Sequence, residues 1–386
     1  MATFSSFRSS WSWWGGTANA VAVDGQSISL HGDYLRIYSY SHGFGSSGAR
    51  ATGAANSDID TGSGDDSVSI NSSARSNNGW WWGSGSASAK GLDNSNLDTG
   101  SGNDSISINT NASSNGGWWW WNRGGNADSV GIDNNSSINT GSGNDSLYVH
   151  SFATGSNTNA WAIRNSSIDM GSGDDYVSLN ATTFQTQRRY DPAYGSENSS
   201  IDLGTGNDRL FINANASGQG DIRAFGSLNS SIDAGDGNDS VSINASANSW
   251  GAWDPATAKG VAGSSVDLGS GNDRLSINAN AWGGRTQSTA VENSDIDTGS
   301  GDDSVSINSS ARSNNGWWWG SGSASAKGLD NSNLDTGSGN DSISITTNAS
   351  SNGGWWWWNR GGNADSVGID NNSSICLLYT SDAADE

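Results

Sequence analysis

Cysteine, proline and large aliphatic side chains are scarce in this chain of 386 residues. The single cysteine, Cys376, excludes an internal disulfide framework. Only 33% of the residues are hydrophobic, and no stretch approaches the roughly 20 apolar residues of a membrane-spanning helix. The first residues, MATFSSFRSSWSWWGG, lack the apolar centre of a secretory signal peptide, so we expect export without an N-terminal signal.

Positive charge is also scarce. The chain has 17 Lys and Arg residues against 39 Asp and Glu residues, which gives a net charge of -22. This balance disfavours nucleic acid and anionic membranes as partners, because both repel an acidic surface. It favours metal cations instead.

The sparse apolar residues are regularly placed, which argues against the disorder that this composition otherwise suggests. A sixteen-residue pattern recurs nine times, Asn-Ser-x-Ile-Asp-x-Gly-x-Gly-Asn/Asp-Asp-x-Val/Ile/Leu-x-Ile/Leu-Asn, and a clear copy runs from Asn198 to Asn213. The first aspartates of successive copies are 30 to 41 residues apart. Repeats of this length are typical of solenoids.

Alternation within the pattern predicts two strands per copy. Ile201 and Leu203 point inward around an outward Asp202, and Leu210 and Ile212 point inward in the second strand. A third apolar run, such as residues 160–163, precedes each copy. The prediction is an all-β fold, a parallel β-helix or β-roll-like solenoid of about ten triangular or flattened coils, with the variable loop after the second strand.

Four regions are expected along the chain. They are an N-terminal tail (1–16), a degenerate capping coil that has lost its Gly-x-Gly (17–56), the solenoid (57–375) and a foreign tail (376–386). Residues 56–138 reappear as residues 293–375 with one difference, Asn109 against Thr346. After residue 375 the repeat breaks off into a sequence that looks like a translated sequencing adaptor. We therefore expect the natural protein to continue past residue 375.

The turn between the two strands contains the candidate metal ligands. Its glycines permit positive φ, and its aspartates supply the hard oxygen ligands that Ca²⁺ prefers. Carboxylates stacked at one-coil spacing repel one another. A divalent ion bound between the turns would make the electrostatic interaction between them attractive. The predicted metal ligands are Asp60, Gly62, Gly64, Asp66, Asp98, Gly100, Gly102, Asp104, Gly141, Gly143, Asp145, Asp169, Gly171, Gly173, Asp175, Asp202, Gly204, Gly206, Asp208, Asp233, Gly235, Gly237, Asp239, Asp267, Gly269, Gly271, Asp273, Asp297, Gly299, Gly301, Asp303, Asp335, Gly337, Gly339 and Asp341.

One alternative needs no metal: the turns are solvated Asx-Gly turns. In the third of the nine copies Asn139 replaces the first aspartate, so a metal site there is expected to be weaker.

The run Gly-x-Gly-Asn-Asp-x-hydrophobic resembles the hemolysin-type calcium-binding repeat of RTX proteins. The resemblance implies a parallel β-roll with Ca²⁺ between stacked turns and export by a type I system without an N-terminal signal. It would make Gly204, Gly206 and Asp208, with their counterparts, the calcium ligands. The first glycine of that family's nonapeptide is Thr, Leu, Met or Ala here, and the motifs are not tandem. A larger coil with one metal column is therefore expected.

Two columns of asparagine are predicted at coil corners, because stacked amides hydrogen-bond from coil to coil. One column opens the pattern and the other closes it. The opening column includes Asn165, Asn198 and Asn229, and the closing column includes Asn180, Asn213 and Asn244.

Tryptophan is abundant, with 21 residues, and fourteen of them form four runs in the variable loops. These runs either stack within the molecule or form an exposed patch for self-association or surface glycans. The residues are Trp80, Trp81, Trp82, Trp118, Trp119, Trp120, Trp121, Trp317, Trp318, Trp319, Trp355, Trp356, Trp357 and Trp358.

No catalytic constellation is visible in the sequence, so an enzyme is not expected; Arg188-Arg189 is the only compact basic spot. The first hypothesis is an extracellular calcium-binding repeat protein with a structural or adhesive role at a cell surface or in a matrix. The alternative is a carbohydrate-binding or polysaccharide-modifying β-helix module. Ice binding is weaker, because no strand carries a regular threonine array.

Overall fold

The fold comes from a computed structural model. It describes residues 2–13, 15–30, 33–45, 47–77, 85–115, 125–186, 189–251, 254–314, 322–352 and 362–378. Strands, joined by turns and short loops, make up this part of the chain, and no helix occurs in it. Accordingly, no helix among the described residues meets the length and apolar character needed to cross a membrane.

The strands form three parallel sheets of eleven strands each. Sheet A consists of β1 (Ala2–Trp13), β4 (Asp33–Phe44), β7 (Ser67–Asn77), β10 (Ser105–Asn115), β13 (Ser146–Gly155), β16 (Tyr176–Gln185), β19 (Arg209–Gly218), β22 (Ser240–Ser249), β25 (Arg274–Gly283), β28 (Ser304–Asn314) and β31 (Ser342–Asn352). Sheet B consists of β2 (Thr17–Asp24), β5 (Gly48–Ala55), β8 (Ala87–Asp93), β11 (Asn126–Asp133), β14 (Asn157–Arg164), β17 (Arg189–Glu197), β20 (Gly220–Leu228), β23 (Pro255–Ala262), β26 (Arg285–Glu292), β29 (Ser323–Asp330) and β32 (Asn363–Asp370). Sheet C consists of β3 (Ser27–Ser29), β6 (Asp58–Asp60), β9 (Asn96–Asp98), β12 (Ser137–Asn139), β15 (Ser167–Asp169), β18 (Ser200–Asp202), β21 (Ser231–Asp233), β24 (Ser265–Asp267), β27 (Asp295–Asp297), β30 (Asn333–Ser338) and β33 (Ser374–Leu378).

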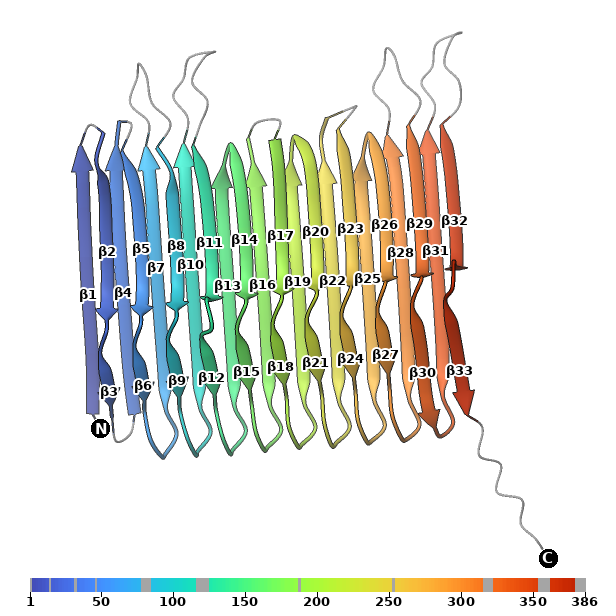
Figure 1. Cartoon of the computed structure of the whole chain (residues 1–386), viewed down its shortest axis with the longest axis horizontal. Coiled ribbons are helices and arrows are strands. Elements are labelled where there is room, and N and C mark those ends of the chain that lie inside the picture. Colours follow the sequence, from blue (N-terminus) through green and yellow to red (C-terminus); the bar gives the residue numbers. More distant parts are fainter. Residues whose placement is uncertain are drawn as a thin grey trace, which may run out of the picture.

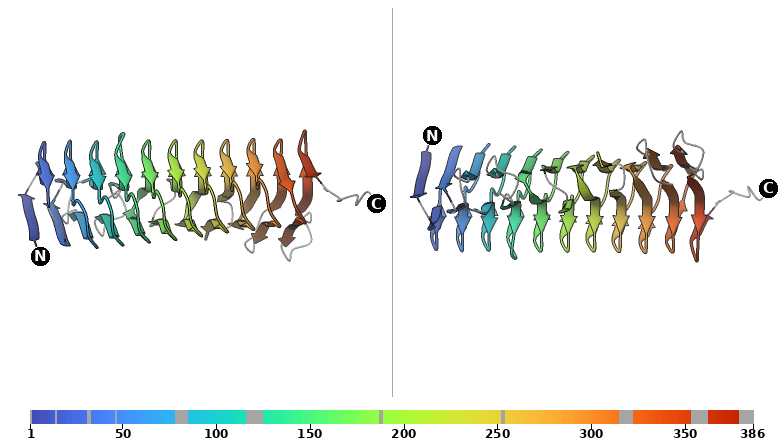
Figure 2. Two further views of the ribbon diagram at one scale, coloured as in Figure 1. Left: turned by 90° about the horizontal axis from the view of Figure 1, so that it is seen from below. Right: turned by 90° about the horizontal axis from the view of Figure 1, so that it is seen from above.

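Each coil runs through one strand of sheet A, one of sheet B and one of sheet C, and the next coil stacks beside it (Figure 1). Sheet A forms one broad layer, and sheets B and C lie end to end in the opposite layer (Figures 1 and 2). The predicted parallel β-helix solenoid is confirmed, in the flattened form. Stacking eleven strands at about 4.8 Å gives a slab roughly 50 Å long.

The core between the layers is thin. Ile201, Leu203, Leu210 and Ile212 are fully buried, as the alternation predicts. Sheet B faces the sheet A isoleucines with glycine in most coils: a Cβ on Gly226 would lie 2.4 Å from the Cγ2 of Ile243. Small residues in one layer therefore make room for branched ones in the other.

The first coil differs from the expectation. Residues 2–13, placed in a tail by the sequence analysis, form β1, which pairs with β4 along its whole length. The degenerate copy of the pattern spans β3 and β4, so β1 covers its outer side. The strand was missed because residues 2–13 carry no copy of the pattern. At the other end, Cys376 belongs to β33, and residues 379–386 lie outside the described part.

Candidate functional site

The acid turns stack directly on one another through their main chains. The Thr205 N–H donates to the Gly171 carbonyl of the preceding coil (2.9 Å), and the Thr205 carbonyl accepts from the Gly173 N–H (2.8 Å). Gly206 has a φ of 145°, and a Cβ on it would lie 1.7 Å from the Gly173 carbonyl oxygen. Both glycines of the turn are thus explained by backbone conformation and close stacking.

The first aspartates of the pattern form an exposed row on sheet C. Asp202 stands between Asp169 and Asp233 in strict register. Desolvation, and then the neighbouring carboxylate, raise the pKa of Asp202 and of Asp233. The exposed row is Asp60, Asp98, Asp169, Asp202, Asp233, Asp267, Asp297 and Asp335, with Asn139 between Asp98 and Asp169.

Part of this exposed row adopts the Asx geometry considered from the sequence. The Oδ1 atoms of Asp267, Asp297 and Asp335 each accept the N–H of the glycine two residues on, at 2.9–3.1 Å. These carboxylates therefore help to close their own turns.

The second aspartates form a separate, buried row. Each backbone N–H in this row donates to the Oδ1 of the aspartate in the next coil, as from Asp175 to Asp208 at 2.7 Å and from Asp208 to Asp239 at 2.8 Å. The buried row is Asp66, Asp104, Asp145, Asp175, Asp208, Asp239, Asp273 and Asp303, and the half-buried Asp341 ends it. Sequence reasoning placed these carboxylates together but missed their burial.

Burial has a large electrostatic effect on this row. The Oδ2 atom is buried and has no hydrogen-bond partner within the described residues in the coils of Asp104 and Asp145 and in the four consecutive coils that follow, whose turns lack a threonine directly after the first aspartate. Desolvation raises the pKa of the aspartates in these four coils to about 7. The hydrogen bond that each carboxylate accepts from the backbone N–H of the preceding coil lowers the pKa and offsets part of this rise. The four residues are Asp175, Asp208, Asp239 and Asp273.

A threonine in the turn changes this balance. In the coil of Asp303, the Thr298 hydroxyl donates to the Asp303 Oδ2 at 2.7 Å, which offsets part of the desolvation. The four coils without that hydroxyl carry Met170, Leu203, Ala234 or Leu268 at the equivalent position.

These rows do not fit an ion held between successive turns by both aspartates and the glycine carbonyls. One row is exposed and the other is buried, and neighbouring N–H groups already use the Oδ1 atoms of the buried row and the carbonyl of the first glycine. Within the described residues, no three His, Cys, Asp or Glu side chains are grouped to hold a metal. Calcium binding by the turns stays a prediction.

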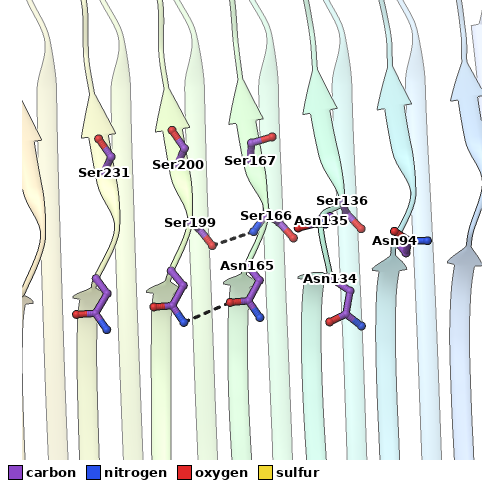
Figure 3. A pocket seen from close by; sticks show the side chains of 12 residues that line it. Asn94, Asn134, Asn135, Ser136, Asn165, Ser166, Ser167, Ser199, Ser200 and Ser231 are labelled. Atoms are coloured by element: carbon purple, nitrogen blue, oxygen red, sulfur yellow. Dashed lines mark hydrogen bonds between the residues drawn. The ribbon is translucent and has the colours of Figure 1, made fainter.

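A shallow polar groove of about 1040 Å³ runs along the corner between sheets B and C (Figure 3). The opening asparagines line it, and the amide of Asn198 donates to the Oδ1 of Asn165 at 3.2 Å. Similar bonds join Asn94 to Asn56 and Asn331 to Asn293, so the predicted contact is confirmed for pairs of neighbouring coils. Beside them a buried serine row links the coils, since the Ser166 N–H donates to the Ser199 Oγ at 3.3 Å. The opening asparagines have positive φ, 49° at Asn198, and this is a second reason for asparagine there.

We expect Asn198→Ala to lower the free energy of unfolding by about 1–2 kcal/mol, because alanine is strained at this φ. Asn198→Gly is the matched control, since Gly263 occupies the same position in its own coil with a φ of 59°. The midpoint of urea unfolding measures both. Equal losses for alanine and glycine would show that the amide ladder, and not the backbone, sets the preference.

The closing asparagines form the second predicted column, on the outer face of sheet A. The amide of Asn213 donates to Asn180 at 2.9 Å, and that of Asn244 donates to Asn213 at 3.0 Å. The column is confirmed, but its predicted place at a coil corner is wrong, because the sheet A strands continue past it, as β19 does to Gly218.

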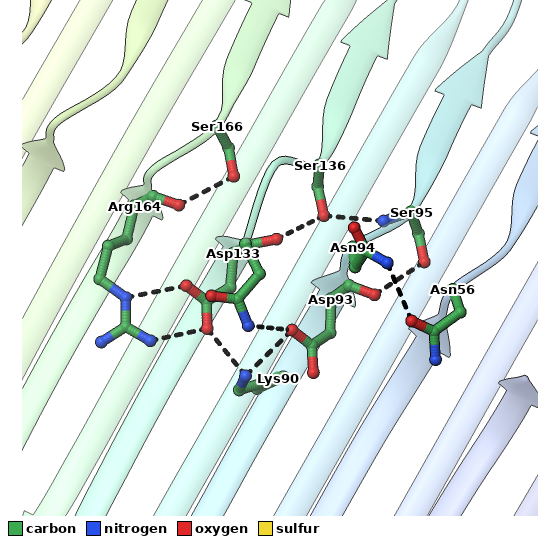
Figure 4. Close-up of polar contacts among 10 residues, drawn as sticks. Asn56, Lys90, Asp93, Asn94, Ser95, Asp133, Ser136, Arg164 and Ser166 are labelled. Atoms are coloured by element: carbon green, nitrogen blue, oxygen red, sulfur yellow. Dashed lines mark hydrogen bonds and ion pairs between the residues drawn. The ribbon is translucent and has the colours of Figure 1, made fainter.

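An ion-pair network on sheet B was not predicted (Figure 4). The fully buried carboxylate of Asp133 accepts from Arg164 at 2.7 Å and lies 2.9 Å from the Lys90 Nζ, so it joins three coils. Hydrogen bonds from Arg164 and Lys90 overcome the desolvation and lower the pKa of Asp133. Farther along the register row of Lys90, the rings of Trp161, Tyr194 and Phe225 stack with centroids 5.5 and 5.0 Å apart. Because the loops before these strands differ in length, the sequence alone does not show that these residues align across the coils.

The four tryptophan runs, Arg188 and His31 lie outside the described residues, as does the side chain of Arg189. Comparison with protein-family models, with curated proteins and with solved structures found no match. The architecture defines the class, a flattened parallel β-solenoid, and the likeness to RTX repeats rests on the turn residues.

Proposed function

We propose that this protein is a stiff structural or adhesive element at a cell surface or in an extracellular matrix. The observation that carries the proposal is the parallel register of the three eleven-stranded sheets, which shifts within sheet C where β30 pairs with β33. Side chains of like kind therefore form rows on both broad faces, and repeated rows suit a repeated or extended partner.

Several features support stiffness. Backbone ladders, the two asparagine columns, the buried aspartate row and the serine row all run along the stacking direction. Each coil is thus joined to the next at several points around its perimeter. Calcium belongs to this proposal as an additional stabiliser, and the exposed row of first aspartates presents solvent-facing carboxylates where the ion would bind.

Single-molecule force spectroscopy on the full chain tests the structural role. We expect separate rupture events that each release one coil of 30–41 residues, or about 100–150 Å of contour length. Smooth extension without rupture events, as for a flexible polymer, would contradict a load-bearing role.

The second candidate function is carbohydrate binding. A groove on the outer face of sheet A favours it.

A further inference from the structure

The outer face of sheet A is uneven near its N-terminal end. Aromatic side chains stand on β1, β4 and β13, whereas β7 and β10 between them carry asparagine and serine. The register places Tyr38, Asn71, Asn109 and His150 in one row across the strands. The result is a groove of about 460 Å³ with aromatic walls and an amide floor.

The wall on β1 and β4 is held in place by its own contacts. The Tyr40 hydroxyl lies 3.2 Å from the His42 Nδ1, and the Tyr40 ring lies 5.9 Å from the ring of Trp11. The same His42 stacks between Trp11 and Phe44, with centroids 5.1 and 4.1 Å away. In front of this support Phe7 is 68% exposed and Tyr38 37% exposed, so both present ring surface to a ligand.

The opposite wall is formed by His150 and Phe152 on β13. Between β4 and β13 lie three strand spacings, or about 14 Å. This width, with an open top, admits a chain of six-membered rings lying along the strands.

The floor offers hydrogen-bonding groups. Asn109 donates to the Oδ1 of Asn71 at 3.3 Å and to the Oγ of Ser107 at 3.1 Å. His150 interrupts the asparagine column in the next coil, so the Oδ1 of Asn109 accepts no hydrogen bond from a described residue. Asn111 and Ser73 add an amide and a hydroxyl in the adjoining row.

The groove carries no carboxylate, lysine or arginine among its lining residues, although the whole chain has a charge of -22. Burial lowers the pKa of His150, so its imidazole is neutral at neutral pH. A charged ligand would find no counter-charge among the lining residues, although Arg36 and Arg75 stand on the same outer face, two residues along β4 and β7 from Tyr38 and Ser73.

We propose that this groove binds a neutral oligosaccharide. The apolar faces of pyranose rings would stack on Tyr38, Phe7 and Phe152, and the sugar hydroxyls would bond to the amides of the floor. Aromatic rings beside short polar side chains provide both interactions at once. This inference stands on the groove alone and does not depend on the proposed structural role.

The chain contains its own comparison for this site. The duplicated segment repeats the floor on β28 and β31 as Asn308, Ser310 and Asn348, but β25 beside it carries Asn278 and Asn280 in place of an aromatic wall. The one position that differs between the two copies, Asn109 against Thr346, is a floor position. The walls and this one floor position therefore distinguish the groove from its copy.

Isothermal titration of the full chain with cellohexaose and with chitohexaose tests the proposal, with hexagalacturonate as the acidic comparator. We expect at least one neutral hexasaccharide to bind with a Kd below about 1 mM, and the double substitution Tyr38→Ser, Phe152→Ser to weaken it about tenfold or more. Serine is chosen because neighbouring strands carry it on the same face. Phe211→Ser removes an outward aromatic outside the groove and should leave the affinity unchanged.

Circular dichroism of both variants checks that the solenoid stays folded. The proposal is overturned if neither neutral hexasaccharide binds, or if hexagalacturonate binds as tightly as the neutral sugars. It also fails if the double variant keeps full affinity or if Phe211→Ser loses as much. A dimer that the double variant abolishes would overturn it too, by assigning the groove to a second copy of the chain.

Discussion

Replacing Gly206 by alanine is expected to lower the free energy of unfolding by about 3 kcal/mol or more. The new Cβ would lie 1.7 Å from the Gly173 carbonyl oxygen, at a φ of 145° that alanine rarely adopts. Overpacking and backbone strain then add, and neither can relax without moving a whole stacked turn. Urea unfolding followed by far-UV circular dichroism measures the loss.

Gly64→Ala is the matched control for this prediction. Gly64 occupies the same place in the first acid turn, with a φ of 112°, but a Cβ added to it would have no atom of a described residue within 4 Å, and the sequence of the preceding coil has no Gly-x-Gly. Only backbone strain of about 1–2 kcal/mol is expected there. Equal losses for Gly64→Ala and Gly206→Ala would mean that stacking contacts do not explain the second glycine.

Stability is expected to fall as the pH rises from about 4 to about 7. The four buried aspartates of the central coils have folded-state pKa values of about 7 against an ordinary value of 3.8. Over this range the folded state binds more protons than the unfolded state, so rising pH favours unfolding. The four carboxylates are neighbours in one row, so they titrate as a coupled set and the loss of stability is spread over this pH range.

Replacing the buried set Asp175, Asp208, Asp239 and Asp273 by asparagine should flatten this pH profile. Asparagine keeps an accepting oxygen for the backbone N–H and carries no charge. The matched control replaces the exposed aspartates of the same coils, Asp169, Asp202, Asp233 and Asp267, and changes the net charge equally. Thermal melts across the pH range compare the two, and equal flattening by both sets would show that burial is not the cause.

The same two variants separate proton binding from calcium binding. The RTX resemblance predicts that millimolar Ca²⁺ raises the melting temperature at about pH 8, where the buried row is ionised. If the exposed-row variant loses that response, the ion binds at the exposed row. If only the buried-row variant loses it, our interpretation of the buried row as closed to metal is wrong.

The repeat made much of the architecture predictable. Alternation around Asp202 and Phe211 indicated both the strands and the inward residues, and a constant pattern length indicated the register of the two asparagine columns. The opening asparagines were assigned to a ladder alone, because a sequence pattern does not report φ.

The buried aspartate row shows where the sequence was insufficient. Asp202 and Asp208 are aspartates of the same turn, and the sequence does not distinguish their burial, so both were assigned to one metal site. The path of the turn between them places one carboxylate in solvent and the other in the interior, and no residue pattern encodes that path. The groove on sheet A could not be predicted without the register of β1, β4, β7, β10 and β13, and β1 carries no repeat pattern from which to align it.

The duplicated segment has a genetic consequence. Its offset of 237 residues contains seven acid turns, so it corresponds to a whole number of coils. Unequal crossing-over between the two copies would delete or add that number of coils and join strands that already match in register. Such an event would lengthen or shorten the solenoid by a fixed number of coils. The strands at the junction would keep their register.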